Sequence, residues 1–544
     1  MSLSRPPRFR GVFRTDALAR AVYSEAAGVA QILPAAIAVP ASAPDVVALV
    51  RWAAESGTPL VPRGSGSSLA NGALGEGVIV DLVRLDRIDT LVPRARTLVV
   101  GAAVTRDRVQ SSTSRHGLAF PIDPSSSAFA TLGGMCATHA AGARMMKYGP
   151  LREWITGLDC VFADGTRAWL RRGEPAPEIP ALARFTQAVA PLVRAADPAM
   201  LRHAGVRKES SGYALAAWRE SDEFIDLILG SEGTLALIVA AELKLTKSPG
   251  ATASLLAGFP DLEGAAAAAV NLAAHGASAV ELLDRSFLEI AASEGSAFPL
   301  PGGLQAVLLI EAEMHAEADA RQLVKELSGW CEAGGAVHLE TAMSAQEELR
   351  LWGLRRAASP LLNQLAPRLQ SMQLVEDGCV PPAHFAQYVR GVRDALTRAR
   401  FRGVIFGHAG DAHLHVNALV DVTEPDWRAR AERLVADVTA LIVRLGGTVS
   451  GEHGDGRLRT PLLARTWRPE AIELFAATKQ AFDPGGILNP GVKVPIAGAK
   501  PLGAIKYDPA LPALPPAARE ALDLVVREKA WARHRLDLLP TFQP

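Results

Sequence analysis

Two glycine-rich segments set the strongest limit on what this chain can fold into. VPRGSGSSLANG (61–72) continues an apolar stretch expected to be a strand, and TLGGMCATHAAG (131–142) has the same mixture of glycine and small residues. Gly64, Gly66 and Gly72 leave the main chain free to approach a ligand closely, and the serines between them offer donors to phosphate oxygens. Two segments of one composition, each expected to be a loop next to a strand, predict a site for a long ligand with a pyrophosphate in its middle.

Neither segment carries a standard nucleotide signature, because the first neither opens a helix as G-x-G-x-x-G nor reads G-x-x-x-x-G-K-[ST]. A surface turn explains the first segment alone equally well, since glycine clusters mark turns in general. A third segment, GSEGT within residues 227–245, precedes an apolar β stretch and again leaves main chain open to a ligand. The three segments together favour ligand binding.

The chain length predicts more than one domain, because a single hydrophobic core stops growing near about 250–300 residues and this chain has 544. Short strands and helices are expected around the glycine segments. PDVVALVRWAAESG (44–57) predicts a helix that closes at a glycine, TPLVPRG (58–64) a strand, and residues 170 to about 205 a helical insertion. Further on, strands and helices alternate in a slower rhythm, which predicts a second sheet domain covered by helices. The expected parts are an N-terminal extension, a ligand-binding domain, a second domain and a tail without assigned structure, at residues 1–30, 31–248, 249–493 and 494–544.

The charge balance narrows the class of partner. Basic and acidic side chains number 57 each, so a small molecule is expected rather than nucleic acid or anionic lipid. Four cysteines lie far apart without a C-x-x-C pair, which argues against disulfides and iron–sulfur clusters in this chain and favours a reducing compartment. No apolar window predicts a transmembrane segment. A cytoplasmic protein is expected, free or peripheral at the inner face of the membrane, and a homo-oligomer is compatible with the sequence.

Two histidine motifs, FGHAGDAHLHVN (406–417) and SGEHGDG (450–456), predict a metal site. His413 and His415 are two residues apart and are expected on one face of a strand. His408 precedes a Gly-Asp turn, which is expected to fold it back beside these two histidines. Together with a carboxylate from the second motif, these imidazoles suit Zn²⁺ or Mn²⁺ with one position open for substrate. Any single histidine is explained as an ordinary polar residue near a turn, but two glycine-bracketed motifs are not.

The glycine segments VPRGSGSSLANGA and GSEGTLALI, with PIDPSSSAFATLGGMCATHAAGARMMKYG and GLDCVFADG, resemble the FAD-binding domain of the vanillyl-alcohol-oxidase flavoprotein superfamily. The histidine motifs resemble its D-lactate dehydrogenase/glycolate oxidase branch, and the resemblance covers residues 20–495. It implies an α+β protein with a two-subdomain PCMH-type FAD-binding domain. An α/β cap domain with a ferredoxin-like antiparallel sheet and a C-terminal helical segment is expected to follow and to hold the substrate.

The resemblance also implies which residues hold FAD, with the pyrophosphate in the first glycine segment and the flavin and ribityl chain along the second. The residues that match the family motifs are Arg63, Gly64, Ser65, Gly66, Ser67 and Ser68 in the first segment, Gly133, Gly134, Thr138 and Gly142 in the second, and Glu232, Gly233, Ile238 and Asn489 as further contacts.

Two departures from the family pattern bear on the cofactor. Ser67 stands where covalently flavinylated relatives often carry histidine, so dissociable FAD is expected. His139 stands where asparagine is usual. It either lies beside the flavin or replaces asparagine in a structural hydrogen bond, and the structural role is favoured.

For the histidine motifs, the resemblance implies that His408, His415 and Glu452 bind a divalent metal and that His453 is the active-site base. His413 stands where asparagine is usual, and it is a fourth ligand, a group behind the ligands, or neither.

The resemblance also places catalytic Arg355 on the substrate carboxylate, since Trp352 and Arg355 match a Trp-x-x-Arg motif. Relatives that oxidise D-2-hydroxyglutarate place a lysine at a position that matches Val375 here, which favours a monocarboxylate such as D-lactate, or glycolate. The expected reaction is FAD-dependent, metal-assisted oxidation of a D-2-hydroxy acid to the 2-oxo acid, with hydride passing from C2 to flavin N5. The electrons are expected to pass to a quinone, cytochrome, electron-transfer flavoprotein or iron–sulfur subunit, because no NAD site is recognised.

Two other functions are compatible with the FAD-binding motifs. A redox-neutral transferase of the alkyl-glycerone-phosphate synthase type needs room for an alkyl chain and a phosphate site, and no additional Lys/Arg-rich loop indicates one. A non-catalytic flavin-binding subunit is disfavoured by the intact set His408, His415, Glu452 and His453.

Overall fold

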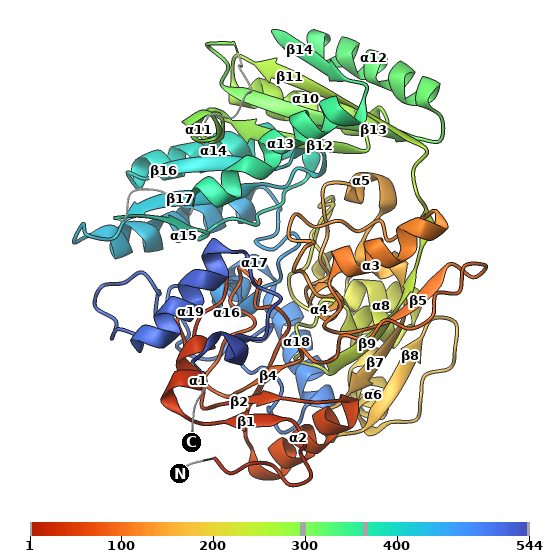
Figure 1. Cartoon of the computed structure of the whole chain (residues 1–544), viewed down its shortest axis with the longest axis vertical. Coiled ribbons are helices and arrows are strands. Elements are labelled where there is room, and N and C mark those ends of the chain that lie inside the picture. The colour runs from red at the N-terminus through yellow and green to blue at the C-terminus, as the bar shows by residue number, and fades with distance from the viewer. Residues whose placement is uncertain (1–2, 294–300, 363–367, 541–544) are drawn as a thin grey trace.

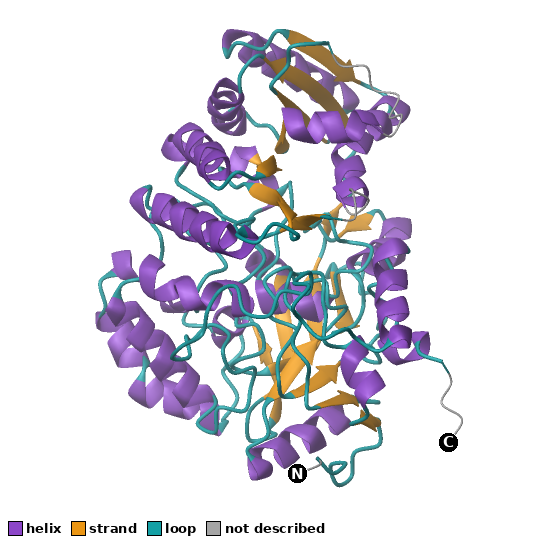
Figure 2. Ribbon diagram, turned by 90° about the vertical axis from the view of Figure 1, so that its left-hand side faces the viewer, coloured by secondary structure: helices purple, strands orange, loops and turns teal. Residues whose placement is uncertain are grey.

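The computed structural model describes residues 3–293, 301–362 and 368–540, and within them the chain folds as an α+β protein (Figure 1). Two four-stranded sheets lie in its N-terminal half and a seven-stranded sheet follows them. Figure 2 shows loops gathered between the seven-stranded sheet at the top and the two smaller sheets below it. The expected fold class is confirmed.

The first sheet has the order β1-β2-β4-β3, in which β2, β3 and β4 are parallel and β1 is antiparallel. Its helix α2 follows the prediction from sequence: apolar residues at i, i+3, i+4 and i+7 are buried, and the helix ends at Gly57 with a φ of +66°. Strand β3 then runs directly into the first glycine segment. The elements are β1 (Val12–Arg14), α1 (Ala17–Val22), β2 (Ala36–Val39), α2 (Ala43–Ser56), β3 (Leu60–Arg63) and β4 (Val78–Asp81).

The second sheet is antiparallel with the order β5-β9-β7-β8, and a short ribbon pairs β6 with β10. The helical insertion predicted between residues 170 and 205 is formed by α6 and α7. The elements are β5 (Thr97–Gly101), α3 (Arg106–Thr113), β6 (Leu118–Ala119), α4 (Leu132–Thr138), α5 (Met145–Tyr148), β7 (Ile155–Val161), β8 (Arg167–Arg171), α6 (Pro180–Ala188), α7 (Ala190–Ala195), α8 (Leu215–Ser221), α9 (Phe224–Ile228), β9 (Leu237–Lys244) and β10 (Thr246–Lys247).

The second glycine segment is largely helical, so its interpretation as a loop was wrong. Helix α4 begins after Thr131, whose hydroxyl accepts the N–H of Gly134, and ends at His139 in the left-handed conformation. A Cβ on Gly133 would lie 2.7 Å from the Cβ of Ala102. Glycine at this position therefore allows the helix to pack closely on the chain that follows β5, which the composition alone did not distinguish from a loop.

The third sheet is antiparallel throughout, with the order β14-β11-β13-β12-β16-β17-β15. Helices α10, α12, α14 and α15 share a hydrophobic core with one face of the sheet, and α11 and α13 pack on the other face. The elements are β11 (Ala251–Phe259), α10 (Leu262–Ala274), β12 (Ala279–Asp284), α11 (Arg285–Ser293), β13 (Ala306–Met314), α12 (Glu317–Ala333), β14 (His338–Ala342), α13 (Ala345–Leu362), β15 (Leu369–Met372), α14 (Phe385–Arg398), β16 (Arg402–His408), β17 (His415–Asp421) and α15 (Trp427–Arg444).

The last part of the chain returns to the N-terminal half. Helix α18 packs on α6, and α19, in the tail that had no assigned structure, packs on α1 (Figure 1). Ala518, Ala521 and Leu522 join the core of the first sheet, so the two ends of the chain share one apolar cluster. The elements are α16 (Gly456–Arg459), α17 (Leu463–Thr466), α18 (Pro469–Phe482) and α19 (Pro516–Arg527). No helix in the described ranges is long and apolar enough to cross a membrane.

A buried ion pair joins the third sheet to the N-terminal half. Arg144, directly before α5, donates from Nε to Glu311 Oε1 and from a second nitrogen to Glu311 Oε2, both at 2.7 Å. Glu311 lies on β13 and is 3% exposed. Because this carboxylate is buried, it depends on the guanidinium for compensation, and the pair holds the third sheet over the glycine segments.

We expect Arg144→Met to destabilise the protein by about 3–5 kcal/mol, because it leaves Glu311 buried and unpaired. Thermal unfolding measures the effect. The double variant R144M/E311L should recover most of the loss, and R321M should have little effect because the Arg321–Glu317 pair is exposed. Equal midpoints for R144M and R321M would contradict the structural role of the pair.

Candidate active site

A cavity of about 400 Å³ lies between the glycine segments and the third sheet, and it brings together most of the residues predicted from sequence. One end is lined by the FAD-binding candidates and the other by the histidine and arginine candidates. The predicted residues that line it are Arg63, Gly64, Ser65, Gly66, Ser67, Ser68, Gly133, Gly134, Thr138, Glu232, Gly233, Ile238, Arg355, His415, Glu452 and His453. Gly142, His408 and Asn489 are not among its lining residues.

The first glycine segment forms a cradle of main-chain N–H groups. The carbonyl of Gly66 accepts the N–H of Ala27 at 3.0 Å and that of Ser68 accepts the N–H of Gly28 at 3.3 Å. In a trans peptide the C=O and the next N–H point in opposite directions, so anchoring these carbonyls turns the N–H groups that follow them away from the anchor. The N–H groups of residues 65–68 donate to no other described group.

A buried hydroxyl adds to this cradle, because Ser68 Oγ has no hydrogen-bond partner among the described residues. Main-chain N–H groups and a buried hydroxyl that lack partners are the donor set that a phosphate anion requires. The segment therefore fits the diphosphate of FAD, as the sequence predicted for Arg63 to Ser68.

Arg63 supports the segment from behind. A Cβ on Gly66, whose φ is +74°, would lie 2.4 Å from Arg63 Nη2, so only glycine lets the turn close over the guanidinium. Arg63 is 2% exposed, and it donates to the carbonyl of Glu25 at 3.0 Å. Its charge lies behind the N–H groups and adds to their positive potential.

Two predicted cofactor residues, Asn489 and Gly142, shape the cavity without lining it, and so does His139. The amide of Asn489 donates to the carbonyls of Glu232 and Gly72 at 2.8 and 3.2 Å, which joins two lining segments. A Cβ on Gly142 would lie 2.3 Å from the carbonyl oxygen of Asp123, so glycine is required for packing there. His139 is buried at the end of α4 with a φ of 54°. Asparagine and histidine are both favoured in this left-handed conformation, which explains the exchange and supports the structural role.

A cluster of three histidines and one carboxylate lies at the second end of the cavity, where His415 and Glu452 line the wall and His408 and His413 do not. His408 ends β16 and His415 begins the adjacent β17. The histidine ring centroids lie 4.7–5.5 Å apart. One ligand atom each from His408, His413, His415 and Glu452 lies within 4.8 Å of the others. His413 precedes β17, so the prediction that it shares a strand face with His415 was wrong, but the turn still brings it into the cluster.

Hydrogen bonds leave one nitrogen of each ring free to face Glu452 or a cation. His408 Nδ1 contacts Glu281, and its Nε2 is 3.0 Å from Glu452 Oε1. His415 Nδ1 bonds to the carbonyl of Glu376 at 2.9 Å, and its Nε2 is 3.4 Å from the same Glu452 oxygen. His413 Nε2 bonds to Asp377 at 2.9 Å.

The remaining nitrogen, His413 Nδ1, is buried and has no partner in the described part of the chain. Burial lowers the pKa of His413 to about 4 even though its hydrogen bond to Asp377 raises it, so the ring is neutral at physiological pH. Three nitrogens from imidazole rings that can be neutral, together with one carboxylate oxygen, are a donor set that suits Zn²⁺ or Mn²⁺. In this geometry His413 joins His408, His415 and Glu452 as a candidate ligand.

Buried charges hold the cluster in place. Lys208 Nζ is 3.0 Å from Glu452 Oε2, which leaves Oε1 for the histidines. Burial raises the pKa of Glu452, but Lys208 and His408 hold it well below its usual value. Glu281 bridges His408 and Arg355, with Arg355 Nε at 2.7 Å from its Oε2. The side chain of Arg355 thus lines the cavity with its orientation fixed, and it makes no other hydrogen bond to a described residue.

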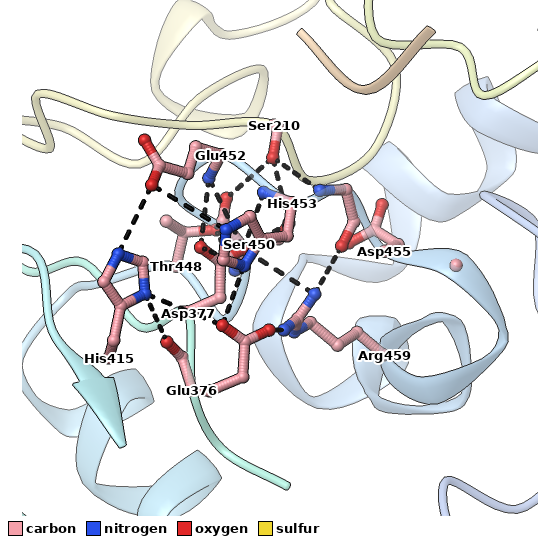
Figure 3. A network of polar contacts seen from close by, with 12 residues as sticks. Ser210, Glu376, Asp377, His415, Thr448, Ser450, Glu452, His453, Asp455 and Arg459 are labelled. Atoms are coloured by element: carbon pink, nitrogen blue, oxygen red, sulfur yellow. Dashed lines mark hydrogen bonds and ion pairs between the residues drawn. The ribbon is translucent and has the colours of Figure 1, made fainter. Parts of the chain in front are cut away.

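Two neighbouring carboxylates fix His453 (Figure 3). His453 Nδ1 is 2.7 Å from Glu376 Oε2, while Asp377 accepts the main-chain N–H groups of Glu452 and His453 at 3.2 and 3.0 Å. Arg459 pairs with both carboxylates. Burial lowers the pKa of His453, but Glu376 and Asp377 outweigh it and raise the pKa to about 9. A cation bound at Glu452 would oppose this shift, because positive charge nearby disfavours the imidazolium.

One sequence argument about substrate is not supported by the geometry. Val375, taken as the position that faces a second carboxylate, packs against the core of the third sheet and does not line the cavity. Ser371 and Gln373 line the wall there instead. Strand β15 ends at Met372 and the chain then turns, so Val375 does not continue the face that Ser371 and Gln373 present to the cavity.

Several residues that build the site were not singled out from sequence: Lys208, Glu281, Glu376, Asp377 and Arg459. Three of them carried a signal, since Glu281 interrupts the apolar strand SAVELLD and the adjacent pair Glu376–Asp377 follows another apolar strand. A charge on a buried strand needs a partner. Lys208 carried no such signal.

Two family models and several known proteins match this chain. Residues 34–171 match the family model described as FAD binding domain, and residues 248–492 match the model described as FAD linked oxidases, C-terminal domain. The chain is 31% identical over 479 residues to the glycolate oxidase subunit GlcD of Bacillus subtilis, covering 87% of this chain and 92% of that protein. It is 29% identical to a D-lactate dehydrogenase of Archaeoglobus fulgidus, covering 83% and 89%.

A solved structure of alkyldihydroxyacetonephosphate synthase has the same fold, with a TM-score of 0.60 and 17% identity over 88% of this chain and 82% of that one.

We expect His413→Ala to weaken Zn²⁺ binding by about ten- to a hundredfold, because it removes the free Nδ1 from the cluster. Competition with a chromogenic chelator measures the affinity, and thermal unfolding of the metal-free variant checks its folding. His116→Ala, at an exposed position, is the matched control. Wild-type affinity in H413A would exclude His413 as a ligand.

Proposed function

Because this chain belongs to the FAD-linked oxidase family, we propose that it is an FAD-dependent, metal-assisted dehydrogenase of D-2-hydroxy acids, with D-lactate or a similar monocarboxylate as substrate. The observation that carries the proposal is one cavity with a phosphate cradle at one end and the cluster around Glu452 at the other. A similar glycolate oxidase subunit and D-lactate dehydrogenase support the substrate class.

The proposal gives each end of the cavity a role. Residues 63–68, with Gly133, Gly134 and Thr138, hold FAD, which supplies the acceptor for two electrons. His408, His413, His415 and Glu452 hold a divalent cation, which supplies a Lewis acid for the substrate hydroxyl. Ser67 leaves no histidine for covalent attachment in the first segment, so the FAD is proposed to be dissociable.

His453 is the proposed base. Its Nδ1 is occupied by Glu376, so Nε2 is the atom that takes the hydroxyl proton. Carbon C2 loses a hydride to the cofactor, and the product is the 2-oxo acid. Because His453 must be neutral to accept a proton, the metal and the base are linked: positive charge at Glu452 lowers the pKa that Glu376 and Asp377 raise.

Arg355 is the proposed partner of the substrate carboxylate. Its Nε is bound to Glu281, and its side chain lines the cavity on the side of the histidine cluster. The wall at Ser371 and Gln373 is neutral, which favours a substrate with one carboxylate over a dicarboxylate. The electrons leave for a carrier of the quinone, cytochrome, electron-transfer flavoprotein or iron–sulfur class.

Anaerobic reduction of the bound flavin tests the proposal. D-lactate should bleach the visible flavin band and L-lactate should not. Glycolate and D-2-hydroxyglutarate are tested beside them. Bleaching by none of these acids would overturn the proposal in favour of a redox-neutral transferase or a non-catalytic subunit.

In the same assay, His453→Gln should slow substrate-dependent reduction by roughly 10²–10⁴-fold, the range for loss of a general base. The variant should stay yellow, because His453 lies at the opposite end of the cavity from the phosphate cradle. His384→Gln, at an exposed position, is the control. Reduction by H453Q at the wild-type rate would refute the base assignment.

A further inference from the structure

The C-terminal tail forms part of the wall of the cofactor cavity. Lys506, Tyr507, Val526 and Trp531 line the cavity, although the matched family models end at residue 492. Because these residues lie outside the family models, nothing in the family match gives them a role.

Arg535, in the same tail, lies behind the first glycine segment. It is 1% exposed, and its Nη2 donates to the carbonyl of Ser65 at 3.4 Å. Its Nε and Nη1 have no hydrogen-bond partner in the described ranges. A buried guanidinium with two donor atoms unpaired is costly unless something else compensates its charge.

The charges around Arg535 do not balance. Arg535 and Arg63 are both buried behind the segment, and the carboxylate that acts on both is Asp81, which also accepts a hydrogen bond from the Tyr23 hydroxyl. Burial and the neighbouring Arg63 lower the pKa of Arg535 to about 9, so both guanidinium groups are charged at physiological pH. Among the described residues, one positive charge is left without a carboxylate partner, although Arg535 lies over the Trp531 ring at 5.2 Å from its centroid.

The peptide geometry shows where the missing negative charge belongs. The Arg535 donor fixes the Ser65 carbonyl toward the tail, so the N–H of Gly66 in the same trans peptide points the other way. That N–H is one of the groups in the phosphate cradle that donate to no described partner. An anion in the cradle would therefore lie across the peptide from Arg535.

We propose that Arg535 is a cofactor-binding residue of the C-terminal tail, whose buried charge balances the diphosphate of FAD across the Ser65–Gly66 peptide and so couples docking of the tail to occupancy of the cavity. The inference rests on the FAD site described above and does not depend on the substrate.

Other contacts hold the tail in place without Arg535. Arg519 pairs with Glu25 at 2.8 Å, Arg428 pairs with Asp508 at 2.8 Å, and Ile505 forms a bridge with Ala30. Helix α19 also shares an apolar cluster with α1. Substitution of Arg535 is therefore expected to leave the fold intact.

Titration of deflavinated protein with FAD, followed by flavin fluorescence, tests the proposal. Arg535→Gln should weaken FAD binding by roughly ten- to a hundredfold, the range for a lost interaction with a charged group. R535K should retain most of the affinity because it keeps the charge. Arg533→Gln, which removes a neighbouring exposed arginine, should bind FAD as the wild type does.

Thermal unfolding separates this role from a structural one. Without FAD, R535Q should be as stable as the wild type or more stable, because it removes an unbalanced buried charge; with FAD, it should gain less stability. Wild-type FAD affinity in R535Q, or an equal loss of stability with and without FAD, would overturn the proposal.

Limited proteolysis of the unmodified protein gives a second test. FAD should slow cleavage within residues 494–540, because it completes the charge balance that docks the tail. Equal cleavage with and without FAD would contradict the coupling. None of these measurements uses a substrate, so a failed substrate assignment would leave their results unaffected.

Discussion

Two buried carboxylates, Asp377 and Glu232, hold the turn 450–456 between the third sheet and the FAD-binding half of the protein. Asp377 accepts the N–H groups of Glu452 and His453, and Glu232 accepts those of Asp455 and Gly456. The turn 450–456 is thereby held from one side by the third sheet domain and from the other by the FAD-binding half. Because a buried carboxylate without such donors is costly, the turn, the candidate ligand and the candidate base are fixed together.

The features predicted correctly from the sequence are those that depend on local residue patterns. Helix α2, strand β3 and the glycine segment after it follow from apolar spacing and from Gly57, and the histidine motifs identified His408, His415 and Glu452 before any geometry was known. Composition did not distinguish helix α4 from a loop, since the glycines there serve close packing as well as ligand approach. Lys208 and Arg535 could not be found, because their importance comes from partners that are distant in the sequence, Glu452 and Ser65.

The site as a whole contains polar groups that the protein alone does not satisfy. Ser68 Oγ and two nitrogens of Arg535 lack partners near the phosphate cradle, and His413 Nδ1 lacks one in the histidine cluster. Native proteins pair nearly all buried polar atoms, so clusters of unpaired atoms mark where ligands complete the structure. The first group suits an anion and the second a cation, which supports the proposed diphosphate-containing cofactor and the proposed divalent metal.

The most direct test of this account is a crystal structure of the protein purified with its cofactor, with anomalous diffraction measured at the absorption edge of the bound metal. We expect FAD with its diphosphate at residues 64–68, and an anomalous peak within bonding distance of His408, His413, His415 and Glu452. A diphosphate bound elsewhere, or fully occupied FAD and substrate with no anomalous peak at Glu452, would contradict it.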